Sequence, residues 1–223
     1  MLKAIIFDMD GTLFQTDKIL ELSLDDTFEH LRQIGEWDTE TPIEKYREIM
    51  GVPIQIVWET LMPLHSNELR ESANTIFHER LIENIRKGQG ALYPNTVEAL
   101  TILKETGFSI FIASNGLTEY LKAIVDYYHL DTWVTETFSI QQIDSLDKGE
   151  LVKGIVNKYS ITSGAVVGDR LTDINAAKAN GLSAIGCNFD FAKVEELAQA
   201  DVVIDDLFEL KEVVNKTFTI NLK

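Results

Sequence analysis

Two carboxylates follow directly after an apolar run at the start of the chain. Asp8 and Asp10 come after Ala4-Ile5-Ile6-Phe7, which is typical of a buried strand. Gly11 and Thr12 complete the string Asp-Met-Asp-Gly-Thr. Acidic side chains held close together repel each other and resist desolvation, so a fold tolerates them mainly where a shared proton or a cation compensates, such as a divalent ion bound to a phosphate. The alternative is a strand followed by an ordinary Asp-Gly turn.

A second apolar run, Ala165-Val166-Val167-Gly168, also ends in acid, at Asp169 and then Asp173. In an open parallel sheet, ligands bind at the carboxyl ends of the strands, so two such ends can share one site. Asp169 would then complete, with Asp8, a set of the oxygen ligands that Mg²⁺ requires. The alternative is that Asp169 or Asp173 caps the helix expected over residues 171–180.

Two further segments carry groups that suit a phosphate. The expected strand at Ser109 leads into Ser114, Asn115 and Gly116 before a helix, and a hydroxyl with free amides at a helix start suits an anion. Ser and Asn are also ordinary N-caps. Lys148 opens another expected helix and is a candidate cation for the same phosphate, although a single Lys is usually solvated.

Taken in order, the four segments resemble the motifs of the haloacid dehalogenase (HAD) superfamily, in its phosphatase branch, and the match spans nearly the whole chain. The resemblance implies that Asp8 is a nucleophile and Asp10 a general acid and base. It implies a phosphate-binding set of Thr12, Ser114, Asn115 and Lys148. It also implies a Mg²⁺ cofactor, held by Asp8, the backbone carbonyl of Asp10 and Asp169, with Asp173 either a ligand or a supporting partner.

The charges of these residues are consistent with that chemistry. A carboxylate and a phosphomonoester are both anions, so Mg²⁺ and Lys148 would have to offset their repulsion before Asp8 attacks. The attack would give an aspartyl-phosphate, which divides one hard hydrolysis into two easier steps. Asp10 would protonate the leaving group and later accept a proton from water, with Thr12 orienting it. An acid at this position argues against the dehalogenase branch, whose halide leaving group needs none.

Composition limits the partners. The chain has 20 Lys and Arg against 36 Asp and Glu, a net charge of -16, which disfavours nucleic acid polymers and acidic membrane surfaces. We expect a small phosphorylated metabolite as the partner. The lone Cys187 excludes an intrachain disulfide, fits a reducing cytoplasm and is expected in the core. No secretion signal and no apolar run of about 18 residues is present, so a cytoplasmic enzyme is expected.

Beyond residue 90, helix signals alternate with strand signals. Helices are expected over 95–107, 117–128, 148–159 and 171–180, and strands near Ser109, Ala165, Ala184 and Val202. This alternation predicts an α/β fold with a doubly wound parallel sheet.

Between Phe14 and about Gly90 there are helix signals only, which predicts a separate helical unit. One helix is expected before Gly35 and another from about Ser66 to near Gly88. Thr41-Pro42-Ile43-Glu44 reads as a capping box with Pro at the first helical position.

We therefore expect an α/β catalytic core of residues 1–14 and 90–223, and an inserted helical cap of residues 15–89. The resemblance implies that this cap closes over the site and reads the leaving group. Leu13-Phe14-Gln15 and Gln89-Gly90 are candidate hinges, or plain loops.

Substrate choice is less constrained. Met50-Gly51-Val52-Pro53-Ile54 resembles the specificity loop of the superfamily, but sugar-phosphate mutases carry Arg and His where this chain has Ile54 and Leu20, which argues against a mutase. Gln15 is a further departure, because many relatives have Asp there. Nearby Trp58 is expected in the core of the cap, although Trp37 or Trp58 would stack on a planar substrate if either faced the site.

The leading hypothesis is a Mg²⁺-dependent phosphatase for a phosphoglycolate-like acid or a nucleoside monophosphate. The alternatives are a phosphotransferase or pyrophosphatase of the same superfamily, and a noncatalytic phospho-acceptor module. Asp10 and the inserted helices argue against the last, because such a module is shorter and lacks a general acid. The sequence leaves the oligomeric state open.

Overall fold

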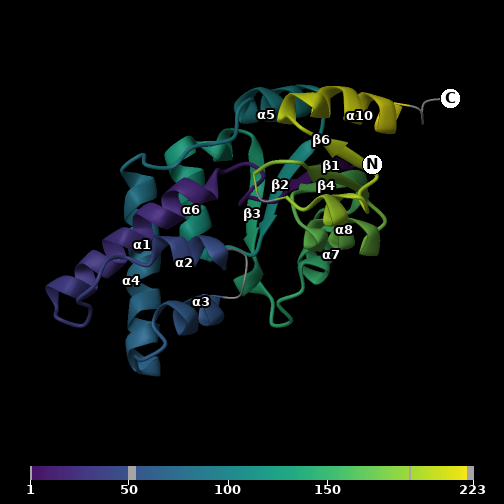
Figure 1. Ribbon diagram of the computed structural model, residues 1–223. Helices are drawn as coiled ribbons and strands as arrows, with labels where there is room; N and C mark the ends of the chain where they lie inside the picture. The colour runs from purple at the N-terminus through teal and green to yellow at the C-terminus, as the bar shows by residue number, and fades with distance from the viewer. Residues whose placement is uncertain (1, 50–53, 191, 220–223) are drawn as a thin grey trace. The chain divides into compact units, whose positions relative to one another are not determined.

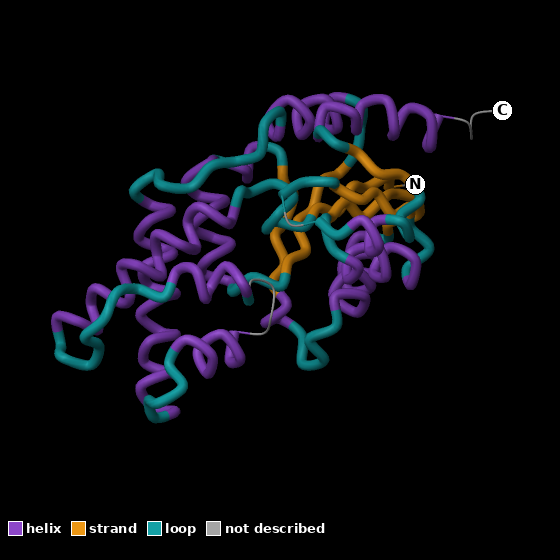
Figure 2. The backbone as a smooth tube through the Cα atoms, in the orientation of Figure 1, coloured by secondary structure: helices purple, strands orange, loops and turns teal. Residues whose placement is uncertain are grey.

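The computed structural model describes residues 2–49, 54–190 and 192–219 (Figure 1). The chain divides into two compact units, which we call the α/β unit (Met1–Gln15 with Ala91–Lys223) and the helical unit (Thr16–Gly90). All strands of the sheet belong to the α/β unit (Figure 2). Among the described residues, every helix is too short or too polar to cross a bilayer.

The α/β unit is built on a six-stranded sheet in the order β3-β2-β1-β4-β5-β6, with every neighbouring pair parallel. The strands are β1 Leu2–Phe7, β2 Ser109–Ser114, β3 Val134–Ser139, β4 Ile161–Gly168, β5 Ser183–Cys187 and β6 Val202–Ile204. This is the strand order of a doubly wound fold, and the order reverses between β1 and β4, where such folds bind ligands. The predicted fold class is confirmed.

Helices cover both faces of this sheet. They are α5 Thr96–Glu105, α6 Thr118–Tyr128, α7 Lys148–Tyr159, α8 Leu171–Ala179, α9 Val194–Leu197 and α10 Leu210–Thr219, with 3-10 turns η1 Leu130–Thr132, η2 Ile140–Gln142 and η3 Leu207–Glu209. Ala4 and Ile6 of β1 pack in the cluster that includes α7 and α8. Ile5 and Phe7 alternate to the other face, where α5 and α10 lie together (Figure 1). Both pairs are fully buried, which explains the unbroken apolar run.

Strand β3 is a part of the fold that the sequence reading missed. Its residues read Val-Thr-Glu-Thr-Phe-Ser, and only the first and last are buried. It lies at the edge of the sheet and, among the described strands, pairs with β2 alone. Because an edge strand buries less surface, it tolerates polar residues and shows no apolar run.

The helical unit contains α1 Thr16–Gln33, α2 Ile43–Glu48, α3 Ile54–Leu61 and α4 Asn67–Arg86. An aromatic cluster holds it together: the Phe28 ring lies 4.7 Å from Trp37 and 6.3 Å from Trp58, and Trp58 lies 5.8 Å from Phe77. The side chain of Trp58 is buried, as expected for the core of this unit. These contacts account for both tryptophans without a stacked substrate.

The two predicted helix starts in this unit have different outcomes. The helix expected from about Ser66 is α4, and Ser66 is its N-cap, because its side chain accepts a hydrogen bond from Leu69 N. The capping box at Thr41 is wrong: α2 begins at Ile43, and Pro42 occupies the N-cap without a side-chain bond. The hydroxyl of Thr41 instead donates to Asp25 Oδ1 at 2.5 Å. This charge-assisted bond orients the hydroxyl toward Asp25, and the start of α2 has no side-chain cap.

The chain leaves and re-enters the α/β unit through two segments that pair with each other. Gln15 N donates to Ala91 O and Tyr93 N donates to Leu13 O, both at 2.9 Å. The side-chain amide of Gln15 donates to Leu92 O at 2.8 Å. The side-chain bond gives Gln15 a structural role at a position where many relatives were expected to carry Asp. The backbone bonds show that the candidate hinge at 13–15 is hydrogen-bonded to residues 91–93.

Candidate active site

Asp8 and Asp169 lie at the carboxyl ends of two neighbouring strands. Phe7 is opposite Val167 in the β1–β4 register, and Asp8 N donates to Val167 O at 2.8 Å. Asp8 directly follows β1 and Asp169 directly follows β4, so the parallel pairing brings both to one edge of the sheet. Asp173 joins them from the first turn of α8.

These three aspartates form a buried cluster. Each offers a carboxylate oxygen, and the three oxygens lie within 4.8 Å of one another. The residues are only 7%, 4% and 1% exposed, in the order Asp8, Asp169 and Asp173. Exposed acidic groups often lie near each other in proteins, but burial of three carboxylates is costly unless positive charge is close.

Lys148 supplies one positive charge. Its Nζ lies 2.8 Å from Asp8 Oδ1 and 2.5 Å from Asp173 Oδ1, and its side chain is buried. Burial alone lowers the pKa of Lys148, but attraction to Asp173 and Asp8 outweighs burial and raises it, so the ammonium stays charged. The alternative of a solvated surface lysine is therefore wrong.

One ammonium does not balance three carboxylates. Burial, followed by the charges of Asp8 and Asp173, raises the pKa of Asp169 to about 7. Burial also raises the pKa of Asp173, although Lys148 opposes that rise. A compact set of hard oxygen donors with excess negative charge fits a divalent cation such as Mg²⁺. The residues present therefore fit the metal that the sequence suggests.

Gly11 and Thr12 hold the loop after β1 against Asp169. Gly11 has φ +73°, and a Cβ added there would lie 2.6 Å from Asp169 Oδ2. Only glycine fits this close approach. Thr12 Oγ1 donates to Asp169 Oδ1 at 3.4 Å, so Thr12 orients Asp169, which corrects the expectation that it orients Asp10.

The Asp10 side chain lies outside the carboxylate cluster. Its Oδ1 accepts a hydrogen bond of 2.5 Å from the hydroxyl of Tyr120 on α6. The Asp10 side chain is therefore not among the described carboxylates that could share a metal ion. Sequence reasoning missed Tyr120, because nothing in its local pattern separates it from an ordinary core residue of an amphipathic helix.

Ser114 is the last residue of β2, which lies next to β1, and Asn115 follows it. Phe7 is opposite Ile112, so Ser114 reaches the same edge of the sheet as Asp8. Ser114 is buried and its Oγ accepts from Gly116 N at 3.0 Å, whereas Asn115 is exposed. Ser139, at the end of β3, donates to Gly116 O at 2.6 Å. Sequence reasoning missed Ser139 because it missed β3.

Asp173 combines the helix-capping role weighed for it with a contact to another residue of the site. Its Oδ2 accepts a hydrogen bond from Arg170 N at 3.0 Å and so caps α8, while its Oδ1 pairs with Lys148. The cap and the site contact use different oxygens of one carboxylate. The two interpretations are therefore compatible.

Comparison with known proteins agrees with this geometry. Residues 2–181 match the family model of the haloacid dehalogenase-like hydrolases. The chain belongs to this family. A phosphoglycolate phosphatase of Agrobacterium fabrum is 26% identical to this hydrolase, over 92% of this chain and 89% of the relative.

Two solved structures show the same fold. A predicted phosphoglycolate phosphatase from Haemophilus somnus has a TM-score of 0.79 at 20% identity, covering 96% of this hydrolase and 98% of the other chain. CbbY from Rhodobacter sphaeroides, solved in complex with phosphate, has a TM-score of 0.75 at 19% identity, covering 94% and 96%. The family match makes the hydrolase an enzyme, and these two structures share its fold over most of each chain.

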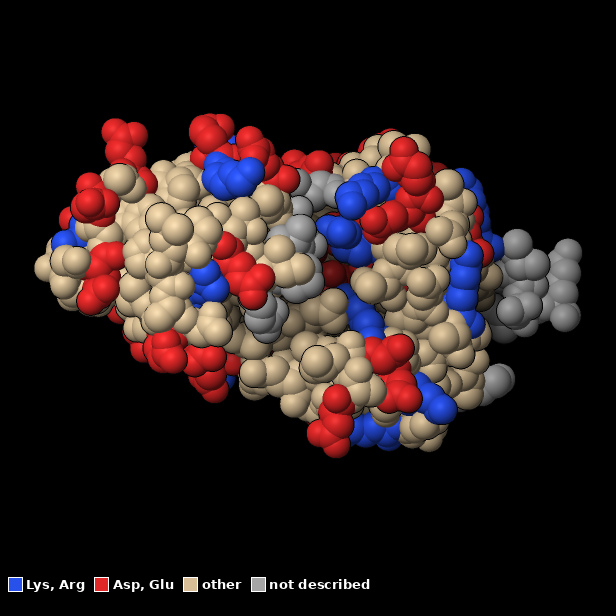
Figure 3. Space-filling model, turned by 60° about the horizontal axis from the view of Figure 1, so that its bottom comes forward, with Lys and Arg blue, Asp and Glu red and all other residues tan. Residues whose placement is uncertain are grey.

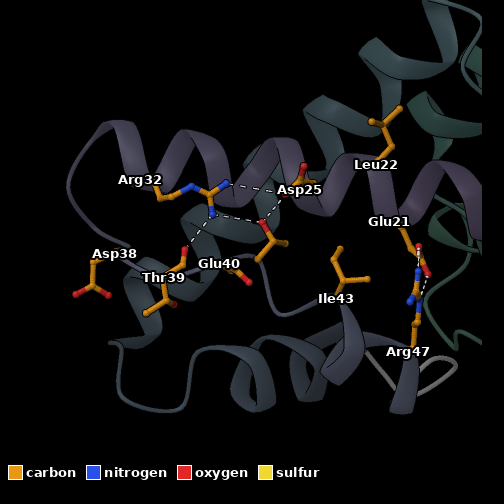
Figure 4. A pocket seen from close by; sticks show the side chains of 10 residues that line it. Glu21, Leu22, Asp25, Arg32, Asp38, Thr39, Glu40, Ile43 and Arg47 are labelled. Carbon is orange, nitrogen blue, oxygen red and sulfur yellow. Dashed lines mark hydrogen bonds and ion pairs between the residues drawn. The ribbon is translucent and has the colours of Figure 1, made fainter.

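The helical unit of the hydrolase has a hollow of about 990 Å³ with two arginines in its lining (Figure 4). Arg47 pairs with both oxygens of Glu21, at 2.6 and 2.7 Å, and with Glu44. Arg32 bonds Asp25 and the carbonyl of Thr39. Both lining arginines are committed to neighbours, so Arg47 is a paired surface charge here rather than a ready anion contact.

The segment that resembles the specificity loop lies mostly outside the described residues. Met50 to Pro53 are not described, and Ile54 begins α3. His65 packs against Trp37, at 5.3 Å between ring centroids. Cys187 is fully buried in the core of the hydrolase, as predicted.

Proposed function

We propose that this hydrolase is a Mg²⁺-dependent phosphatase that cleaves a small phosphomonoester through an aspartyl-phosphate. The observation that carries the proposal is the buried cluster of Asp8, Asp169 and Asp173 around Lys148, with Asp10 beside it on the same loop. Phosphoryl transfer to an aspartate needs a nucleophilic carboxylate, a cation close to it and further carboxylates that can hold a divalent metal ion.

Asp8 is the proposed nucleophile. It follows the buried residues 4–7 of β1, its backbone is held by the bond to Val167 O, and its Oδ1 pairs with Lys148 at 2.8 Å. Lys148 would attract the phosphate and lower the repulsion between two anions. Asp173 would hold Lys148 in place through their 2.5 Å contact.

Asp8, Asp169 and the backbone carbonyl of Asp10 would hold the metal, with Asp173 as a further ligand or as a partner behind them. When bound, Mg²⁺ would neutralise charge on the phosphate oxygens. Thr12 orients Asp169 through its hydroxyl. Removal of any of these carboxylates is therefore expected to weaken metal binding.

Ser114 and Asn115 are the proposed phosphate contacts at the start of α6, where the backbone amides and the helix dipole also favour an anion. Asp10 is the proposed acid that protonates the leaving oxygen and the base that later activates water. Its position outside the carboxylate cluster suits this role, because the side chain is not needed as a ligand.

A small substrate fits the charge of the molecule. On the face shown in Figure 3, acidic side chains stand in several separate groups with Lys and Arg between them. With a net charge of -16, such a surface favours a small anion held by local cations over a polyanion. The names of full-length relatives support a phosphoglycolate-like acid, with a nucleoside monophosphate as the other candidate. We expect the protein in the cytoplasm.

The helical unit is the proposed cap, with residues 15–89 inserted between core segments 1–14 and 90–223. We expect it to close over the site, exclude bulk water and select the leaving group. The paired linker segments at 13–15 and 91–93 are its proposed connection to the core.

The test is phosphate release from a panel of phosphomonoesters, with pyrophosphate included, in the presence and absence of Mg²⁺. The wild type is compared with Asp8→Asn and with Asp131→Asn, which alters an exposed aspartate of η1. Turnover that requires both Mg²⁺ and Asp8, and survives Asp131→Asn, is the expected result. Turnover without Mg²⁺, or none on any compound, would overturn the proposal.

A further inference from the structure

Tyr120 connects the helix after β2 to the proposed acid and base. Its hydroxyl donates to Asp10 Oδ1 at 2.5 Å, between residues 110 positions apart in the chain. Both residues belong to the α/β unit. Tyr120 is only 7% exposed, so the bond is largely protected from competing water.

The position of the Tyr120 ring is fixed by the turn that precedes it. A β-carbon placed on Gly116 would come within 3.1 Å of Tyr120 Cδ1, so the ring packs directly on this turn. Ser114 and Ser139 hold Gly116 from its amide and its carbonyl. The phenol is therefore held by the same turn that carries the proposed phosphate contacts.

We propose that Tyr120 is a positioning residue for Asp10, an inference that rests on the proposed phosphatase function. A carboxyl group has two oxygens, and the phenol occupies Oδ1. In this proposal the transferred proton sits on the other oxygen, Oδ2. Fixing one oxygen in this way sets the direction in which the second one presents its proton.

In the first step of the reaction, a bond forms between phosphorus and an oxygen of Asp8 while the ester P–O bond breaks, and the proton on Asp10 Oδ2 passes to the leaving oxygen. In the second, the oxygen of water bonds to phosphorus, the bond between phosphorus and Asp8 breaks, and Asp10 Oδ2 takes a proton from that water. Tyr120 keeps its own proton throughout.

The test compares two leaving groups. The p-nitrophenolate ion leaves without protonation, whereas an alkoxide needs a proton, so only alkyl esters depend strongly on the acid. The variant Tyr120→Phe is assayed with p-nitrophenyl phosphate and with the alkyl phosphomonoester that the wild type hydrolyses fastest. The control is Tyr127→Phe, which removes a partly exposed phenol from the same helix. The measured quantity is kcat/KM, which reports events up to departure of the leaving group.

For Tyr120→Phe we expect kcat/KM to fall about tenfold on the alkyl ester and by less than about twofold on the aryl ester. Tyr127→Phe should change neither. In an Asp10→Asn background, Tyr120→Phe should have no further effect on the alkyl ester. Equal losses on both esters, no loss at all, or an undiminished effect in the Asp10→Asn background would overturn the proposal.

Two further measurements separate an effect on Asp10 from a loss of folding and from failure of the proposed function. Thermal unfolding checks that the variants fold, and Tyr120→Met, whose flexible side chain fills similar space, gives the same comparison if the phenylalanine variant is unstable. The proposed function itself fails if wild-type turnover is independent of Mg²⁺ or of Asp8. That failure appears before any tyrosine variant is compared, so the two are distinguishable.

Discussion

Lys148 and Asp173 form a buried ion pair, with 2.5 Å between Nζ and Oδ1 and side chains that are 3% and 1% exposed. Because the same carboxylate also caps α8, the pair ties the start of α7 to the start of α8. Buried pairs of this kind contribute little net stability but are costly to break, since the remaining charge is left without a partner.

Lys148→Met should therefore destabilise the protein. Removal of the ammonium leaves Asp8 and Asp173 uncompensated, and we expect a loss of about 3 kcal/mol in the free energy of unfolding at pH 8. The loss should be smaller at pH 5, where the carboxylates protonate more readily. Urea denaturation measures both values. Lys216→Met, which breaks an exposed pair with Glu212, should cost less than about 0.5 kcal/mol. A similar loss for both variants would contradict the buried pair.

Metal binding should stabilise the protein more at high pH. The pKa of Asp169 is raised to about 7 in the folded protein and lies at about 3.9 in an unfolded chain, so the metal-free fold holds this proton more tightly. Its contribution to stability is complete below about pH 4 and is lost as the pH rises through about 7. Mg²⁺ competes with the proton, so its affinity should fall up to about tenfold for each pH unit below 7.

Thermal unfolding with MgCl₂ or with a chelator measures this dependence. The rise in Tm on adding Mg²⁺ should be larger at about pH 8 than at about pH 6. Asp169→Asn should remove most of the rise at both values. An equal rise in Tm at both pH values in the wild type would show that the metal does not displace a proton from Asp169.

Gly11→Ala should disrupt the site beyond its effect on the backbone. Gly107 offers a matched control, because it also has positive φ, +88°, but nothing lies within 4 Å of the position of an added Cβ. Each alanine should cost about 1 kcal/mol for the left-handed backbone. Only Gly11→Ala pushes against Asp169, so it alone should lower Mg²⁺ affinity and turnover by about tenfold or more. Calorimetric titration with Mg²⁺ gives the affinity, and equal affinities in the two variants would refute the close approach.

Ser139→Ala should weaken phosphate binding although Ser139 is expected to touch no substrate. Its hydroxyl bonds the carbonyl of Gly116, and loss of that buried hydrogen bond should cost about 1–2 kcal/mol of stability and loosen the turn at Ser114. Inhibition of turnover by inorganic phosphate measures the effect, with Ser145→Ala, at an exposed position, as the control. An unchanged inhibition constant would mean that the turn keeps its shape without the anchor.

The sequence predicted those parts of the site that follow from the parallel pairing of strands, which brings their carboxyl ends to one edge of the sheet. Asp8 and Asp169 each follow a buried apolar run, and parallel pairing brings such ends together, so their proximity was foreseeable. The partner of Asp10 was not, because Tyr120 reaches it only through the packing of α6 after the chain has folded. Thr12 shows the same limit: its place in the motif was clear, but which carboxylate it bonds depends on how the Gly11 turn lies against β4.

The prediction of secondary structure was wrong where the local sequence pattern did not reflect contacts with distant residues. The polar residues of β3 gave no signal, although its last residue, Ser139, anchors the turn after β2. Thr41 has the sequence pattern of a helix start, but its hydroxyl donates a hydrogen bond to Asp25. In both places a contact distant in sequence decided the outcome.

The pairing of Leu13 and Gln15 with residues 91–93 has a consequence for how this enzyme can change. The backbone of the α/β unit holds the two ends of the 16–90 insertion side by side. The entropy cost of closing a loop between these ends rises only slowly with loop length, so the length of the insertion should have little effect on the stability of the core. The helical segment is in effect a replaceable part. A short turn joining residues 15 and 91 should leave the core able to fold, and a different helical segment grafted there should change which compounds are accepted without rebuilding the chemistry.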